Sequence, residues 1–147
     1  MIKNERQYLV TKTQRDKFAR ALEQAEARRS GDPLLAKLEV DALRSQLAEL
    51  EQQLAEYESL RSGGCDVIEA SSLEELPAAL VKARIAARLS QKELSERLHL
   101  KEQQIQRYEA TNYRSASLAR LQQVAKALGV EVRASLLVGG RDSGSAA

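Results

Sequence analysis

The sequence contains few cysteine, histidine, proline and aromatic residues. One Cys and one His among 147 residues exclude an internal disulfide and a zinc site. Two Pro, four Tyr and one Phe, beside many Ala, Leu, Glu, Gln, Arg and Lys, favour an all-α protein with thin interfaces between helices. Because the sequence also lacks a long apolar run and a signal peptide, we expect a cytoplasmic protein with no membrane partner.

No residue pattern in the chain predicts an active site. We find no pair of a nucleophile with a histidine, no cluster of metal ligands and no glycine-rich loop that could hold a phosphate. His99 is the only histidine, and we expect it to lie in a turn. We therefore expect a protein that is not an enzyme, with no catalytic residue, no metal and no cofactor.

The first half of the chain predicts a helical hairpin. We expect an irregular lead-in over residues 1–10 and a helix that Thr13 caps and that runs to about Arg29. A Ser-Gly-Asp-Pro turn then precedes a second helix from about Leu34 to Arg61. In the second helix, apolar residues alternate at spacings of three and four, which is typical of a coiled-coil seam. The seam residues are Val40, Leu43, Leu47, Leu50, Leu54 and Tyr57.

The first helix is too short and too thinly apolar to cover this seam. We therefore expect a homodimer whose hairpins pack together. Three alternatives remain open: the seam packs on the second half of its own chain, it captures a different protein, or the hairpin is monomeric.

Residues 90–109 predict two short helices joined by a tight turn. Ser90 with Glu93 has the spacing of a capping box at the start of the first helix. His99 stands in the turn and should adopt a left-handed or strained conformation. Leu100, Ile105 and Tyr108 point inward from the second helix. The polar residues that point outward from it are Glu102, Gln103, Gln104, Gln106 and Arg107.

This outward face has a composition that suits the recognition of base edges. A glutamine carboxamide can donate and accept at once and so pair with adenine in the major groove, while Arg107 can pair with guanine. An ordinary solvated helix face is the alternative. The segment 82–114 contains eight Lys or Arg against four Glu, a modest basic patch of the kind that phosphate binding requires.

The block from about Leu80 to Val130 resembles the Xre family of phage-repressor-like helix-turn-helix domains. The resemblance implies that Gln91, at the start of the helix that Ser90 caps, touches a DNA phosphate. It also implies that Arg84 and Glu109 form a buried structural ion pair. It implies base-reading positions at Glu102, Gln103, Gln104 and Arg107, with Gln106 and Lys101 as their neighbours. Together with the basic patch, it gives an expected set of phosphate contacts: Gln91, Arg88, Lys92, Lys101 and Arg114.

Three positions depart from the family's pattern. His99 replaces a usual glycine, Lys101 replaces a usual serine or threonine, and Ala110-Thr111-Asn112 lacks a usual glycine. Asn112 can supply the left-handed turn instead.

The remaining segments give the predicted boundaries. The segment Arg61-Ser62-Gly63-Gly64 should end the second helix and form a hinge between a hairpin over residues 1–62 and a domain over residues 66–138. Ser72 with Glu75 should start a helix, and residues 131–138 predict a short strand. That strand could pair with residues 67–70 or with its own copy in a dimer. Residues 139–147 should be a disordered tail.

The expected fold is all-α: a helical hairpin or coiled coil, then a five-helix repressor-like domain and a short C-terminal strand. The function that the resemblance implies is a dimeric repressor that binds double-stranded DNA at an inverted-repeat operator. One alternative is the antitoxin of a type II toxin–antitoxin pair, with a toxin as its partner. Another is a coiled-coil scaffold that does not bind DNA.

Overall fold

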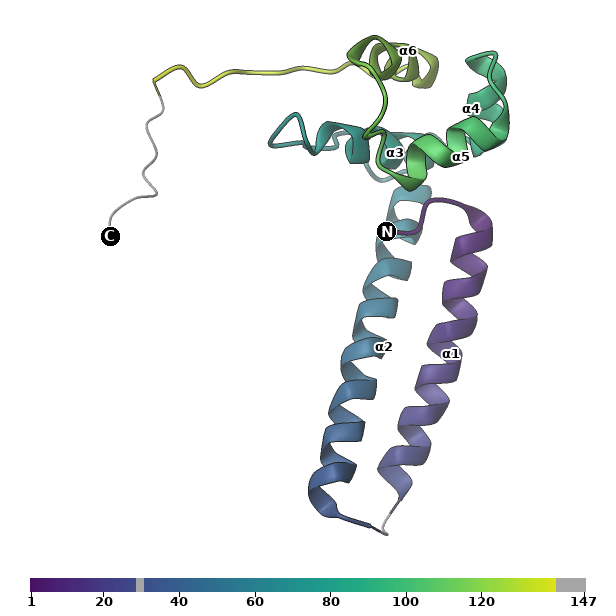
Figure 1. The fold of residues 1–147 in the computed structure, drawn as a ribbon, viewed down its shortest axis with the longest axis vertical. Helices are drawn as coiled ribbons and strands as arrows, with labels where there is room; N and C mark the ends of the chain where they lie inside the picture. Colours follow the sequence, from purple (N-terminus) through teal and green to yellow (C-terminus); the bar gives the residue numbers. More distant parts are fainter. Residues whose placement is uncertain (29–30, 140–147) are drawn as a thin grey trace.

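The computed structural model describes residues 1–28 and 31–139 of the chain. These residues form six α-helices and no strand, which confirms the all-α prediction. The helices are α1 (Glu5–Ala27), α2 (Pro33–Arg61), α3 (Leu76–Ala86), α4 (Gln91–Arg97), α5 (Glu102–Ala110) and α6 (Leu118–Leu128). The long helices α1 and α2 lie antiparallel, and α3 to α6 pack together at one end of this hairpin (Figure 1).

Helix α1 begins well before the predicted position. Asn4 is its N-cap, and the Asn4 side chain accepts a hydrogen bond from the backbone N–H of Gln7 at 2.8 Å. The prediction that Thr13 caps this helix was therefore wrong. Thr13 lies inside α1, where its hydroxyl donates to the carbonyl of Leu9, four residues earlier in the helix, at 3.1 Å. Arg29, the predicted end, is outside the described residues.

Helix α2 follows the prediction closely. Asp32 caps it by accepting from the backbone N–H of Leu34 at 2.9 Å, and Pro33 occupies the first turn. Of the predicted seam, Leu54 and Tyr57 are buried. The other seam residues are half-buried: Val40, Leu43, Leu47 and Leu50. The hairpin therefore covers its own seam only in part.

One hydrophobic core joins the base of the hairpin to the other four helices. Leu54, Tyr57 and Leu60 of α2 belong to the same buried cluster as Val81 of α3 and Ile105 of α5. The cluster crosses the helix break at Ser62, where α2 ends. The two halves of the chain therefore meet through packed side chains rather than through the connecting segment alone.

Three predictions for the segments around α3 to α6 need correction. Ser72 and Glu75 form a turn, and α3 begins only at Leu76 with Pro77 beside it, because proline fits the first turn of a helix. After the hairpin the described chain has four helices rather than five.

The prediction of a short strand at residues 131–138 was wrong. Residues 131–137 have no regular secondary structure and extend away from α6 (Figure 1), since no described segment lies beside them to pair with. Of residues 139–147, predicted as the disordered tail, 140–147 are outside the described residues.

Among the described helices, none is both long enough and apolar enough to cross a membrane.

Candidate nucleic-acid interface

Helices α4 and α5 are joined by a tight turn, as predicted. The capping box at the start of α4 is present: Glu93 N–H donates to Ser90 Oγ at 3.0 Å, and Ser90 N–H donates to Glu93 Oε2 at 2.7 Å. His99 has a φ of 55°, which confirms the left-handed prediction. The backbone N–H of Leu100 then donates to Ser95 O at 2.9 Å and closes the turn.

The start of α5 compensates for its missing serine or threonine. Lys101 occupies the N-cap position, and its backbone N–H donates to Gln104 Oε1 at 2.9 Å. At the other end, Asn112 has a φ of 49° and Tyr113 a φ of 54°, so non-glycine residues make the left-handed turn. Burial raises the pKa of Tyr113, whose ring stacks on that of Tyr108.

The predicted reading face of α5 is exposed over a buried support. Ile105 is fully buried, whereas Gln103 and Arg107 lie in solvent, and the described residues offer no hydrogen-bond partner to either polar side chain. Glu102 and Gln106 are also exposed and are linked by a 3.3 Å hydrogen bond from Gln106 Nε2 to Glu102 Oε1.

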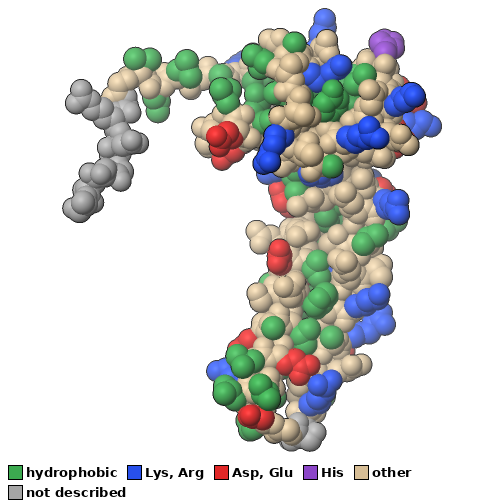
Figure 2. Space-filling model, viewed as in Figure 1, with side chains coloured by type: hydrophobic (Ala, Val, Ile, Leu, Met, Phe, Trp, Pro, Cys, Tyr) green, Lys and Arg blue, Asp and Glu red, His purple; other side chains and the backbone are tan. Residues whose placement is uncertain are grey.

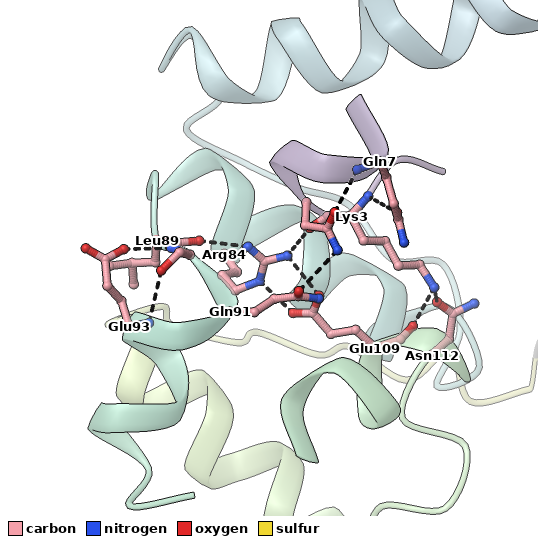
Figure 3. Close-up of polar contacts among 10 residues, drawn as sticks. Lys3, Gln7, Arg84, Leu89, Gln91, Glu93, Glu109 and Asn112 are labelled. Atoms are coloured by element: carbon pink, nitrogen blue, oxygen red, sulfur yellow. Dashed lines mark hydrogen bonds and ion pairs between the residues drawn. The ribbon is translucent and has the colours of Figure 1, made fainter. Parts of the chain in front are cut away.

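A buried ion pair ties the end of α3 to the end of α5. Arg84 Nε lies 2.6 Å from Glu109 Oε1, and Arg84 Nη2 lies 2.8 Å from Glu109 Oε2 (Figure 3). The two side chains are 3% and 1% exposed, so water does not screen the pair. Arg84 Nη1 also donates to Leu89 O at 2.7 Å. The resemblance implied this pair, and its two-point geometry fixes the position of α5 against α3.

Comparison with known families identifies this region. Residues 80–134 match the HTH_3 family model, described as Helix-turn-helix. These residues form an Xre-like helix-turn-helix domain. The match extends from within α3 to the segment after α6, and the α1–α2 hairpin lies outside it. Comparisons with curated proteins and with solved structures found no match. The domain is of the class that DNA-binding transcriptional regulators use.

Residues 1–4 pack on the helix-turn-helix domain, and this contact was not predicted from the sequence. Lys3 Nζ donates to the carbonyl of Glu109 and, at 3.0 Å, to Asn112 Oδ1. Arg84 Nη2 donates to Lys3 O, so the arginine holds the same segment from the other side (Figure 3). Partial burial lowers the pKa of Lys3, and the nearby Glu109 carboxylate offsets part of that shift. Ile2 is buried in the shared core.

Gln91 lies inside this network rather than on the surface. Only 6% exposed, it donates from Nε2 to Glu109 Oε2 at 2.8 Å and accepts at Oε1 from Asn4 Nδ2 at 3.2 Å. Both ends of its carboxamide are thus bonded within the protein, one to Glu109 of α5 and the other to Asn4. This position differs from the expected phosphate contact, and no motif in the sequence indicates that segments so far apart would meet.

The other expected phosphate contacts lie on the surface. Lys92, Lys101 and Arg114 are exposed. Arg88 is exposed as well, but its guanidinium donates to Arg61 O at 3.0 Å and so faces the end of α2.

An open hollow of about 900 Å³ separates the helix-turn-helix domain from the first turns of α1. Residues Glu102, Gln106 and Ala110 of α5 line one side of it. Arg6 and Val10 of α1 line the other. The hairpin therefore begins directly beside the exposed face of α5.

Proposed function

We propose that the protein is a sequence-specific, double-stranded DNA-binding repressor that acts by occupying an operator. The observation that carries this proposal is the exposed face of α5 within a matched helix-turn-helix domain. Gln103 and Arg107 stand out from a helix that the buried Arg84–Glu109 pair holds in place. Because the backbone that carries these side chains is already fixed, α5 does not have to become ordered before they meet base edges.

In the proposed complex, α5 enters the major groove and α4 crosses the DNA backbone. Gln103 pairs with adenine and Arg107 with guanine, and each good contact distinguishes the right base from the wrong one by about 1–3 kcal/mol. The neighbouring polar side chains complete the reading surface: Glu102, Gln104 and Gln106. Exposed Lys92, Lys101 and Arg114 hold phosphates and set the register.

We propose that the repressor acts as a homodimer. Three exposed leucines near the start of α2, Leu34, Leu35 and Leu38, and the half-buried seam give the hairpin apolar surface that a second hairpin would cover. A two-fold dimer would place two copies of α5 about 34 Å apart, one turn of DNA, and would bind an inverted repeat.

Selection of bound sequences from a random pool of duplexes tests the proposal. An enriched inverted repeat is expected. Gln103→Ala should relax the preference at one position in each half-site, whereas Gln122→Ala, an exposed glutamine on α6, should leave all preferences unchanged. Failure to enrich any sequence in dilute buffer would rule out sequence-specific repression, and so would an unchanged preference in Gln103→Ala.

A second candidate function is the antitoxin of a type II pair. The observation that favours it is the extended segment after α6, where Leu136, Leu137 and Val138 are 89–96% exposed and could be covered by a partner protein. Co-expression with the protein encoded by the adjacent gene tests it. Co-purification that is lost when these three residues are changed to serine supports an antitoxin, and DNA binding without such a partner supports a simple repressor.

A further inference from the structure

One face of α1 carries a line of exposed cations. At 3.6 residues per turn, Arg6, Lys17 and Arg20 fall within about 60° of one another around the helix. All three are exposed, and they lie opposite the face that packs on α2, where Thr11 is buried. We call these three residues the α1 cationic stripe. Figure 2 shows Lys and Arg side chains at intervals down the α1 side of the hairpin.

The charges of the stripe are not neutralised within the described chain. Neither residues 1–28 nor residues 31–139 place a carboxylate within 4.0 Å of the three cationic groups. The other hairpin arginines of these segments differ, since they pair with acids: Arg15–Asp16, Arg28–Glu39, Arg44–Glu26 and Arg61–Glu5. Unpaired positive charge in a line favours an extended anion.

The stripe begins beside the reading helix. Arg6 borders the same open hollow as Glu102 and Gln106 of α5. The start of α1 cannot move away freely, because Ile2 is buried in the core and Asn4 bonds to Gln91. A duplex that received α5 in its major groove would therefore bring one sugar–phosphate strand against the first turn of α1.

We propose that the α1 cationic stripe binds the phosphate backbone of the duplex outside the bases that α5 reads. This inference rests on the proposed function, because the duplex is positioned by α5. Arg20 lies 14 positions after Arg6, a distance of about 21 Å along the helix at 1.5 Å per residue. With 3.4 Å per base pair, that length corresponds to roughly 6 base pairs of flanking DNA.

The test compares two triple variants of the full chain. The stripe variant carries Arg6→Gln, Lys17→Gln and Arg20→Gln. The control variant carries Arg15→Gln, Lys37→Gln and Arg44→Gln, which removes the same charge from other faces of the hairpin. Binding is measured by fluorescence anisotropy on the selected sequence with 10 flanking base pairs and on the same sequence without flanks, from 50 to 200 mM salt.

On the flanked duplex, the affinity of the stripe variant should depend less steeply on salt than that of the control variant. Each lost phosphate contact lowers the slope of log affinity against log salt by about 0.9, so three contacts lower it by about 2.7. The affinity lost between 50 and 200 mM salt then shrinks by about 40-fold, as four raised to the power 2.7. On the unflanked duplex the two variants should bind alike, and base preference should not change.

Three results would overturn the inference. The first is an equal slope in the stripe and control variants, and the second is tighter DNA binding by the stripe variant. The third is a stripe variant that binds DNA fully but no longer forms a dimer in light scattering, which would make the stripe a protein contact. The proposed function has a different test: it is wrong if the unchanged protein shows no preference among DNA sequences. A stripe-dependent slope on random duplexes would then still support the inference.

Discussion

The hairpin and the helix-turn-helix domain bury their apolar side chains to different extents. In the domain, Val81, Leu94 and Ile105 are shielded from water completely. In the hairpin, Leu43 and Leu47 remain half-buried. Four short helices can surround a common centre, whereas two long helices can cover only one face of each other. The domain therefore has the packing of a rigid unit, and the hairpin retains surface for contacts with other molecules.

The two regions are nevertheless joined at the point where DNA recognition is proposed. Lys3 and Asn4 from the hairpin side bond to Glu109, Asn112 and Gln91 of the domain. A change at this junction should affect both regions, and a change far along the hairpin should affect only one.

The largest predicted effect comes from breaking the buried ion pair. Arg84→Met leaves the Glu109 carboxylate buried without its partner, so the free energy of unfolding should fall by about 3–5 kcal/mol. Urea denaturation followed by circular dichroism measures it. Arg133→Met is the control, because its pair with Glu131 is exposed and should contribute no more than about 1 kcal/mol. Similar losses in both variants would show that burial does not decide the strength of the pair.

The next effect compares the two cores directly. Ile105→Ala should lower the free energy of unfolding by about 2–5 kcal/mol, because it opens a cavity in a fully enclosed site. Leu47→Ala should lower it by about 1–2 kcal/mol, since water can already reach that side chain. Denaturation at dilute protein concentration measures both. Equal losses would mean that a second hairpin buries Leu47 in solution, and raising the protein concentration would then increase its loss.

A smaller effect is expected at Gln91. Gln91→Ala removes the 2.8 Å hydrogen bond to Glu109 and should lower the free energy of unfolding by about 1–3 kcal/mol. Base preference should stay the same, because α5 keeps its exposed side chains. If stability were unchanged and affinity fell equally for all DNA sequences, Gln91 would be a phosphate contact after all, as the family resemblance implies.

The smallest effect is a pH dependence at the start of α4. The hydrogen bonds from the backbone N–H and hydroxyl of Ser90 hold the pKa of Glu93 below its ordinary value of 4.5. A lowered pKa in the folded state means that this stabilisation is complete above pH 4.5 and is lost as pH falls through the lower value. Thermal unfolding of Glu93→Gln should match the parent protein in strong acid and differ slightly at neutral pH. A constant difference at every pH would contradict this assignment.

Local patterns of the sequence predicted much of the fold. The Asp32-Pro33 start of α2, the Ser90–Glu93 cap and the left-handed His99 each depend on neighbours within a few residues. Arg84 and Glu109 were paired only through the family resemblance, since no local rule joins residues 25 apart.

The missed features depend on partners that are distant in the chain. Asn4 caps α1 two residues after Ile2, and Ile2 belongs to a buried cluster that includes side chains of α2 to α6. The burial of Gln91 likewise follows from the docking of residues 1–4. Residues 131–138 have strand-like composition, but strand formation requires a neighbouring strand, and composition cannot supply one.

The contact between Lys3 and Glu109 also sets an order of events during synthesis. The two residues are 106 positions apart, so at about 5–20 residues per second the ribosome makes the first roughly 5–20 s before the second. The α1–α2 hairpin can form within that interval, but Ile2 has no pocket until the later helices emerge. A nascent chain should therefore expose the Ile2 side chain to chaperones for several seconds, until the later helices fold around it and withdraw it from water.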